Sequence, residues 1–165
     1  MNREELVNKL KEVFSEDIKL NQESFDPIIL VDSKNIINIM QELKENASLS
    51  FNYLMCLSGV DYPPEKIELV YHLFSIEQRH RLCVKTELPR ENSVINSVVS
   101  LWKAAEWHER EIFDLLGVKF EGHTDLRRIL LPEDFTGHPL KKDFSHPEVI
   151  PSPDKKEMMK PAKKT

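Results

Sequence analysis

The sequence predicts an α+β fold: N-terminal helices packed on a mostly antiparallel sheet, then a C-terminal helix, then an extended arm and a tail. Three observations lead to this expectation. Two N-terminal segments repeat apolar residues at helical spacing, and three central segments alternate apolar and polar residues as strands do. A further helical segment, free of glycine and proline, ends at Gly117, and beyond it the periodicity stops.

The N-terminal part of the chain contains two expected helices separated by one buried strand. Residues 3–14 are amphipathic, and Asn2 with Glu5 resembles a capping box at the start of this helix. A short apolar run over 26–32 predicts a strand, and Ser33 is the expected N-cap of the second helix. The residues expected to share a helix face are Leu6, Leu10, Val13 and Phe14 in the first helix, and Ile36, Ile37, Met40 and Leu43 in the second.

Three strands are expected in the middle of the chain. The connection 61–64 contains two prolines and predicts a turn, and the polar link 77–80 predicts an antiparallel hairpin between the second and third strands. The alternating residues are Phe51, Tyr53, Met55 and Leu57 in the first strand, Ile67, Leu69, Tyr71 and Leu73 in the second, and Leu82, Val84 and Thr86 within 81–88 in the third.

The last expected helix spans 104–116, and Gly117 stands where a glycine commonly ends a helix. Glu106, Arg110 and Asp114 follow one another at intervals of four residues. This spacing predicts two ion pairs along the helix, Glu106–Arg110 and Arg110–Asp114. The apolar stripe of the helix is expected to consist of Ala105, His108, Ile112 and Leu115 or Leu116.

The break in periodicity divides the chain into a domain over 1–117, an extended docking arm over 118–146, and a tail over 147–165 that is disordered or docks elsewhere. The tail contains four prolines and five lysines, which is typical of a disordered segment. The predicted arm carries apolar residues without any period that would place them in the domain's own core. We expect these residues to anchor a partner: Leu126, Ile129, Leu130, Leu131, Phe135, Leu140 and Phe144.

Composition excludes several classes of function. The net charge of −5 argues against nucleic-acid binding as the main role. Cys56 and Cys83 are too few to ligate a standard iron–sulfur cluster, and the four glycines cannot form a dinucleotide-binding or P-loop motif. The sequence contains no run of 18 apolar residues and no apolar signal-peptide core. We therefore expect the chain to be cytosolic, or to reach a membrane only through another subunit.

A specific pattern runs from Glu109 to Phe144. It comprises Glu-Arg-Glu followed by Asp114, a hydrophobic pair with a glycine, then Phe-Glu-Gly-His, Arg-Arg-Ile-Leu and Gly-His-Pro-Leu-Lys-Lys-Asp-Phe. The pattern closely resembles the signature of the 30 kDa subunit of respiratory complex I, also called the C subunit of NADH-quinone oxidoreductase. One departure is Ser145-His146, where relatives commonly have a proline. The signature residues are Glu109, Arg110, Glu111, Asp114, Gly117, Phe120, Gly122, His123, Arg127, Arg128, Gly137, His138, Pro139, Leu140, Lys141, Lys142, Asp143 and Phe144.

The resemblance implies a non-catalytic peripheral-arm subunit of a proton-translocating NADH:quinone oxidoreductase, supporting assembly of the quinone-reducing module. It implies no catalytic, cofactor-binding or metal-binding residue in this chain. NADH, FMN, iron–sulfur clusters and quinone would belong to the complex as a whole. The implied partners are the large quinone-chamber (49 kDa-type, D) subunit and the terminal-cluster (B) subunit, contacted through the signature residues. The implied location is the cytoplasmic face of the cell membrane, reached only through these partners.

Other interpretations of single motifs are weaker. Four histidines, His108, His123, His138 and His146, match no compact zinc-ligand spacing, and we expect His123 and His138 to make local hydrogen bonds instead. The carboxylates around Arg110 could form an acid–base site, but an adjacent arginine lowers a carboxylate pKa. A structural ion network is therefore favoured, in which Arg110 ties these carboxylates to the loop after the helix.

Two further questions have alternative answers: what the two basic pairs contact, and which electron donor the complex uses. Arg127–Arg128 and Lys141–Lys142 could contact phosphate or lipid headgroups, but we expect them to dock on acidic patches of partner subunits. The chain could equally be the corresponding subunit of a membrane-bound hydrogenase or another donor:quinone-type complex, because the donor would bind to other chains. A stand-alone α+β binding or enzyme domain is a third possibility, without a catalytic constellation to support it.

Overall fold

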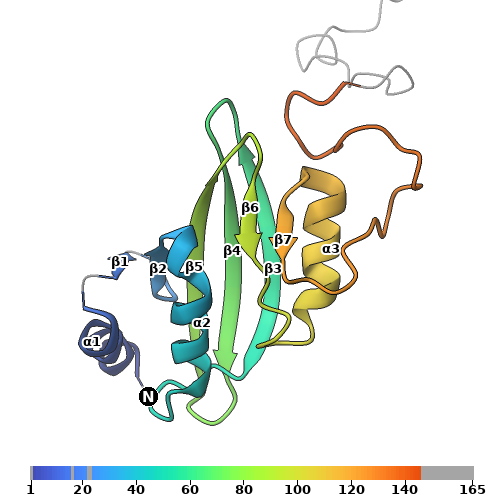
Figure 1. The fold of residues 1–165 in the computed structure, drawn as a ribbon. Coiled ribbons are helices and arrows are strands. Elements are labelled where there is room, and N and C mark those ends of the chain that lie inside the picture. The colour runs from blue at the N-terminus through green and yellow to red at the C-terminus, as the bar shows by residue number, and fades with distance from the viewer. Residues whose placement is uncertain (1, 16, 22–23, 146–165) are drawn as a thin grey trace, which may run out of the picture.

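The computed structural model describes residues 2–15, 17–21 and 24–145. Figure 1 shows a curved sheet flanked by helices, followed by a long segment without regular structure after β7. The helices are α1 (Arg3–Phe14), α2 (Ile36–Glu45) and α3 (Ala105–Leu116), with a 3-10 turn η1 (Ser33–Asn35) before α2. The strands are β1 (Ile18–Asn21), β2 (Ile28–Val31), β3 (Tyr53–Tyr62), β4 (Lys66–Ser75), β5 (His80–Pro89), β6 (Val94–Asn96) and β7 (Lys119–Glu121).

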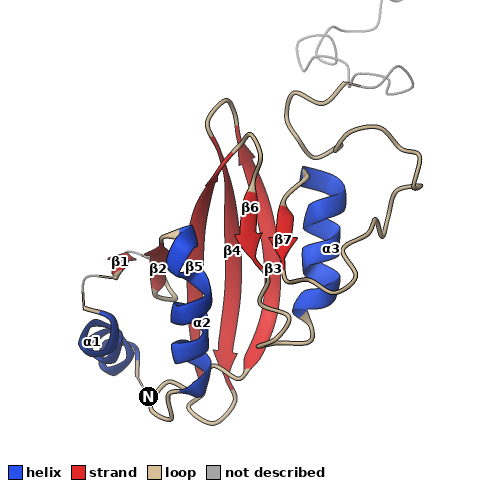
Figure 2. Ribbon diagram, in the orientation of Figure 1, coloured by secondary structure: helices blue, strands red, loops and turns tan. Residues whose placement is uncertain are grey.

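The predicted α+β class and the mostly antiparallel sheet are confirmed. Five strands follow the order β1-β2-β5-β4-β3, in which only β2 and β5 are parallel neighbours. A second, two-stranded sheet pairs β6 with β7. The helices gather on one side of the large sheet (Figure 2). Strand β1 was not predicted, because it has four residues, of which only Ile18 is buried.

The alternation predicted for β4 and β5 is correct. Ile67, Leu69, Tyr71 and Leu73 are all fully buried on one face of β4. Leu82, Val84 and Thr86 of β5 lie beside them in the core. The β4–β5 hairpin is antiparallel along its whole length, as the polar link between the strands indicates.

The alternation predicted for residues 51–57 is wrong at Tyr53 and Met55, although Phe51 and Leu57 are buried. Tyr53 and Met55 are 50% and 41% exposed, whereas Leu54 is buried. The register against β4 shifts between Leu54 and Cys56, and an extra residue in one strand reverses which face the following side chains occupy. Strand β3 also continues to Tyr62, so the turn begins only at Pro63.

The expected helix starts are partly confirmed. In α1, Asn2 Oδ1 accepts from the Glu5 N–H at 2.8 Å, and Glu5 Oε2 accepts from the Asn2 N–H at 2.9 Å, which completes the capping box. Before α2, however, the capping side chain belongs to Asp32, which accepts from the Lys34 N–H at 2.8 Å. Ser33 is the first residue of the 3-10 turn instead, so its prediction as the N-cap was one residue late.

The end of α3 is as predicted, but the domain boundary placed there is not. Gly117 has φ +81° and its N–H bonds to the Phe113 carbonyl, so the helix ends at this residue. Val118 and Phe120 then enter the core with 0% and 3% exposure, and β7 pairs with β6. The packed unit therefore extends past Gly117 to about β7, which is too short a strand to show a period. Residues 122–145, hereafter the arm, follow it.

Candidate functional site

Two signature residues of the arm, Arg128 and His138, bond to Asp114, which lies on α3 and is fully buried. Its Oδ2 accepts three consecutive backbone N–H groups of the arm, from Ile129, Leu130 and Leu131, at 3.0, 2.8 and 3.0 Å. Its Oδ1 accepts from the Arg128 guanidinium at 2.6 Å. One carboxylate thus fixes three backbone N–H groups and one arginine side chain of the arm against the helix.

The charge of Asp114 is held by these contacts. Burial acts to raise the pKa of Asp114, because it disfavours the charged form. The Leu131 N–H, the Arg128 guanidinium and the Leu130 and Ile129 N–H groups together outweigh burial and lower this pKa to about 2. The carboxylate is therefore ionised at neutral pH and acts as a permanent acceptor.

Arg128 extends the same network to the next turns of the arm. Its Nη2 donates to the Phe135 carbonyl at 2.8 Å and to the Gly137 carbonyl at 3.2 Å. The guanidinium also lies 6.0 Å from the Phe135 ring centroid. Because the guanidinium bonds to α3 and to two later arm carbonyls, it holds distant parts of the arm at fixed positions.

Arg110 contacts the arm through backbone carbonyls, and the ion pairs predicted for it with Glu106 and Asp114 are not formed. Its Nε donates to the Arg127 carbonyl at 3.2 Å and its Nη2 to the Arg128 carbonyl at 3.1 Å. The guanidinium lies 5.2 Å from the Trp107 ring centroid. Arg110 therefore does tie the helix to the following loop. The residue that pairs with Asp114 is Arg128, and not Arg110 as predicted.

Two signature histidines make local hydrogen bonds, as expected. His138 Nδ1 lies 2.9 Å from the Asp114 carbonyl, and its ring packs where a side chain on Gly117 would stand. His123 Nδ1 accepts from the Asp125 N–H at 3.0 Å, so its Nε2 donates to the Glu106 carbonyl at 3.2 Å. Within residues 2–15, 17–21 and 24–145, no group of three histidine, cysteine or acidic side chains is placed to hold a metal ion.

A second anchor, centred on Arg90, was not foreseen. Its Nε donates to Asp61 Oδ1 at 2.7 Å, and its Nη1 donates to Asp143 Oδ2 at 2.9 Å. The Lys142 N–H also bonds to Asp61 Oδ2 at 2.8 Å. The Arg90 guanidinium holds the pKa of Asp61 below its ordinary value. Asp61 is the last but one residue of β3 and Arg90 follows β5, and neither has a sequence pattern that marks it.

Glu109 shows why the helix does not offer an acid–base pair. It is fully buried, and its Oε1 accepts from the Val98 N–H at 2.8 Å. Burial raises the pKa of Glu109, contrary to the expectation that Arg110 would lower it, because Arg110 points to the arm. Glu111, by contrast, is exposed on the helix surface. The two carboxylates therefore lie in different environments and do not share a cleft.

The remaining signature residues shape the end of the arm. Gly137 has φ +94°, and a side chain on it would lie 2.8 Å from the Phe144 ring. Phe144 stacks on Phe135 at 6.0 Å between ring centroids. The Leu140 N–H bonds to the Leu115 carbonyl at 3.0 Å. The exposed side chains that this framework presents include Leu130, at 63%, and Leu140, at 56%.

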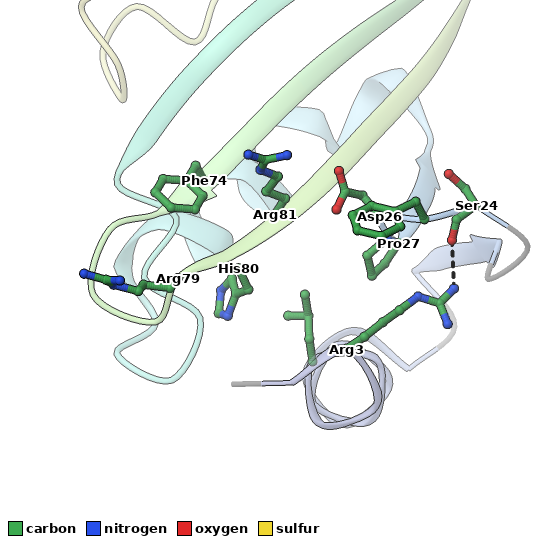
Figure 3. Close-up of a pocket in the computed structure, with 10 residues that line it drawn as sticks. Arg3, Ser24, Asp26, Pro27, Phe74, Arg79, His80 and Arg81 are labelled. Atoms are coloured by element: carbon green, nitrogen blue, oxygen red, sulfur yellow. Dashed lines mark hydrogen bonds between the residues drawn. The ribbon is translucent and has the colours of Figure 1, made fainter.

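One hollow of the described surface lies away from the signature residues. It measures about 840 Å³ and lies between α1, the segment before β2 and the β4–β5 turn. Figure 3 shows Arg3 turned toward Ser24, to whose carbonyl it donates at 3.0 Å, and Arg79 turned to the opposite side. Arg3 and Arg79 of this hollow therefore do not converge on one point, as an anion site would require.

A smaller groove of about 220 Å³ borders the arm. Residues 56–59 of β3 form one wall, and α3 forms the other through residues that include His108 and Glu111. Leu140 lies at its edge. None of the helices in the described part of the chain is long and apolar enough to cross a bilayer.

Comparison with known sequences supports the resemblance. The family model described as "Respiratory-chain NADH dehydrogenase, 30 Kd subunit" matches residues 29–149. The C subunit of NADH-quinone oxidoreductase from Moorella thermoacetica is 45% identical over 139 residues, which cover 84% of this chain and 92% of that protein. The corresponding protein of Chlorobium phaeobacteroides, which has the same name, is 49% identical over 104 residues, covering 62% of this chain and 63% of that protein.

Two solved structures share the fold. A trypsin-resistant fragment of Nqo5, residues 1–134, is 28% identical with a TM-score of 0.65, covering 73% of this chain and 98% of that one. A chain of the membrane-bound sulfane sulfur reductase, an archaeal respiratory membrane complex, is 28% identical with a TM-score of 0.75. The match covers 86% of this chain and 85% of that one. With the family model matching most of its length, the chain belongs to the family of the 30 kDa subunit of respiratory-chain NADH dehydrogenase.

Proposed function

We propose that this chain is a non-catalytic peripheral-arm subunit of a proton-translocating NADH:quinone oxidoreductase and supports assembly of its quinone-reducing module. The observation that carries the proposal is that the signature residues on α3 and in the arm bond to each other. Asp114, Arg110 and Arg128 form hydrogen bonds within the chain, and these bonds shape the arm. The arm in turn presents Leu130 and Leu140 to the surroundings. This arrangement suits a docking element.

The arm is proposed to bind the large quinone-chamber (49 kDa-type, D) subunit, with the terminal-cluster (B) subunit nearby. A fully buried large apolar side chain contributes about 1.5–3 kcal/mol, so two anchoring leucines would contribute substantially to binding. The arm is held at two places, at residues 128–131 by Asp114 and at Asp143 by Arg90, which reduces the entropy lost when it binds. The subunit would lie at the cytoplasmic face of the membrane, through these partners alone.

The chain is proposed to carry no iron, flavin or nicotinamide, and NADH, FMN, iron–sulfur clusters and quinone would bind to other subunits. Two cysteines and no phosphate-binding glycine motif support this proposal. The purified chain should therefore show no visible absorption band. A band with stoichiometric iron or flavin would contradict the proposal.

A second candidate differs in the electron donor. The likeness to a chain of the sulfane sulfur reductase, with a TM-score of 0.75, favours the equivalent subunit of another donor complex as the alternative. A membrane-bound hydrogenase belongs to the same class of alternatives. Mass spectrometry of the complex purified through a tag on this chain separates them. NADH-binding flavoprotein subunits support the first candidate, and a nickel-binding large subunit or a sulfur-reducing chain supports the second.

Removal of the arm tests the docking proposal. Truncation after Gly117 would also remove Val118 and Phe120 from the core, so the chain should be cut after Gly122. The truncated protein is expected to keep its circular dichroism spectrum and lose the large subunit on affinity purification. Normal recovery of the large subunit would show that the domain surface is the dock.

A further inference from the structure

Strand β3 lies at one edge of the large sheet. It is the last strand in the order β1-β2-β5-β4-β3, and among the described strands it pairs only with β4. None of the described loops forms a backbone hydrogen bond with residues 53–61. Alternate residues of an antiparallel strand direct their N–H and C=O groups away from the neighbouring strand. The outer side of β3 therefore carries main-chain donors and acceptors that another strand could use.

The usual protections of an edge strand are missing from the middle of β3. Edge strands are commonly kept from pairing by short length, by proline or by charged side chains. The stretch Cys56–Val60 reads Cys-Leu-Ser-Gly-Val and has neither proline nor charge. Its register against β4 is continuous from Cys56 to Tyr62, so the bulge lies before it. At the other edge of the sheet, β1 has only four residues and is protected by its shortness.

The main chain of this stretch can be reached from outside. Gly59 is partly exposed, and because it has no side chain, the exposed surface is main chain. A side chain on Gly59 would lie 2.5 Å from Leu116, which shows that α3 packs on the core face of β3 here. The groove of about 220 Å³ lies between residues 56–59 and α3. A strand added to β3 would therefore place alternate side chains in this groove.

The groove has an apolar wall and one unpaired charge. Ile112, Leu115 and Leu116 line it from α3, and Leu140 lies at its edge, where its N–H bonds to the Leu115 carbonyl. Glu111 also lines the groove and is exposed. Its carboxylate forms no hydrogen bond or ion pair with any residue in the described ranges. These features suit an apolar side chain that is accompanied by a lysine or arginine.

We propose that the outer edge of β3, over residues 56–60, receives an extended segment of a different subunit, which continues the five-stranded sheet by one strand. Main-chain hydrogen bonds hold the segment, and the groove selects its side chains. Apolar residues of the segment face α3, and a lysine or arginine meets Glu111. The inference rests on the proposed function only in taking this subunit from the same complex, and the contact is separate from the docking of the arm.

A second copy of this chain does not fit the same edge. A two-fold axis that pairs two β3 strands antiparallel would place both α3 helices on one face of the joined sheet. Neighbouring strands are about 4.8 Å apart, whereas packed helices need about 8–10 Å between their axes. Because α3 packs directly on β3, the two helices would overlap. A single extended segment brings no helix into this space, so it is the occupant that the geometry admits.

Hydrogen–deuterium exchange tests the strand addition on the wild-type protein. Mass spectrometry with fragmentation to single residues compares the isolated full-length chain with the purified complex. In the isolated chain, the amides of residues 56–60 should alternate between slow exchange, where they bond to β4, and fast exchange, where they point outward. In the complex, the outward amides should exchange at least about a hundredfold more slowly. Unchanged exchange of these amides in the complex would overturn the inference.

A photochemical cross-link identifies the added segment. Ser58 is exposed, and its position between Leu57 and Gly59 places its side chain on the face opposite α3. The photoreactive amino acid p-benzoylphenylalanine in place of Ser58 should therefore reach the neighbouring strand without disturbing the core. The cross-linked peptide should come from a different subunit, alternate apolar and polar residues, and contain a lysine or arginine. A cross-link to a helix, or to a second copy of this chain, would contradict the inference.

Charge reversal at Glu111 tests the side-chain contact. Tagged Glu111→Lys is expressed beside the untagged wild-type chain, and mass spectrometry measures the ratio of the two in the purified complex. Incorporation should fall about fivefold, because the added strand's cation would then meet a like charge. Glu45→Lys is the matched control, with the same change in charge on an exposed residue at the end of α2, and should incorporate normally. Equal incorporation of the two variants would refute the contact.

Failure of the inference and failure of the proposed function give different results. If the tagged wild-type chain is recovered without other subunits of the complex, the proposed function fails and the inference fails with it. If the complex forms and the outward amides of residues 56–60 still exchange fast, only the strand addition is refuted. If these amides are already protected in the isolated chain, and the chain sediments as a dimer, a second copy occupies the edge.

Discussion

The Asp114 carboxylate meets the Arg128 guanidinium at 2.6 Å, and through this contact helix α3 holds the arm. Asp114 also accepts three N–H groups from the residues that follow Arg128. A buried carboxylate that fixes four donors of one loop acts on the shape of the chain rather than on a substrate. Under the proposed function, these signature residues would serve recognition indirectly, by shaping the arm that carries Leu130 and Leu140.

Asp114→Asn should destabilise the protein by about 3 kcal/mol, because breaking a buried ion pair leaves its partners without compensation. The asparagine keeps the size of the side chain but turns one acceptor into a donor that faces Arg128. Urea unfolding measures the change in free energy. Asp125→Asn is the control, since its pair with Arg127 is exposed and should contribute less than about 1 kcal/mol. Equal effects of the two substitutions would contradict the role assigned to Asp114.

The stability that Asp114 provides should depend on pH. Its folded-state pKa of about 2 lies below the ordinary value of 3.8, so the unfolded chain binds more protons between these values. The contribution is fully present above about pH 4 and is lost as the pH falls toward 2. At roughly 1.4 kcal/mol per pH unit, the total is about 2.5 kcal/mol. The difference in unfolding free energy between wild type and Asp114→Asn should therefore shrink from pH 5 to pH 3, and a constant difference would refute the linkage.

Gly117→Ala and Gly122→Ala form a matched pair that isolates the packing of His138. Both glycines have left-handed backbone angles, with φ +81° and +83°, so each alanine costs about 1–2 kcal/mol in conformational energy. Only at Gly117 would the new methyl group meet a ring, at 2.7 Å from His138, whereas Gly122 has open space. Gly117→Ala should be the more destabilising in urea unfolding and should shift the NMR signals of His138. An equal loss of unfolding free energy in the two variants would show that the His138 ring does not pack against Gly117 in solution.

The features predicted correctly are those that depend on near neighbours in the sequence. The capping box joins Asn2 and Glu5, which are three positions apart, and the end of α3 at Gly117 depends on one backbone conformation. The alternate residues predicted for β4 and β5 form one fully buried face of the sheet. Local chemistry fixes such features, so the sequence reveals them without knowledge of the fold.

The features that were missed depend on contacts between distant residues. Arg90 and Asp143 are 53 positions apart, and nothing near either residue indicates the other. The pairs expected along α3 were wrong because the arm supplies stronger partners: backbone carbonyls for Arg110 and a guanidinium for Asp114. Helical spacing shows which side chains could meet but not which competing groups a folded loop brings closer.

Arg110→Ala should reduce assembly and leave electron transfer in the assembled complex unchanged. The substitution removes two hydrogen bonds to the arm carbonyls of Arg127 and Arg128, and this loosens the arm where it leaves the helix. Native gels measure the amount of intact complex, and NADH:quinone activity is expressed per intact complex. Arg127→Ala is the control, because this guanidinium is exposed and, among the residues that the structure describes, pairs with Asp125. Normal assembly with lost electron transfer would contradict a structural role for Arg110.

The most direct test concerns the two leucines of the arm. Leu130→Ser with Leu140→Ser changes only exposed side chains, so thermal unfolding of the isolated chain should not change. Ile76→Ser alters a similarly exposed residue at the β4–β5 turn, 59% exposed, and serves as the control. The measurement is the amount of large quinone-chamber subunit that co-purifies with the tagged full-length chain. The double variant should recover at least about tenfold less than wild type, given the contribution of each buried leucine, while Ile76→Ser recovers a normal amount. Wild-type recovery with the double variant would show that the arm is not the dock.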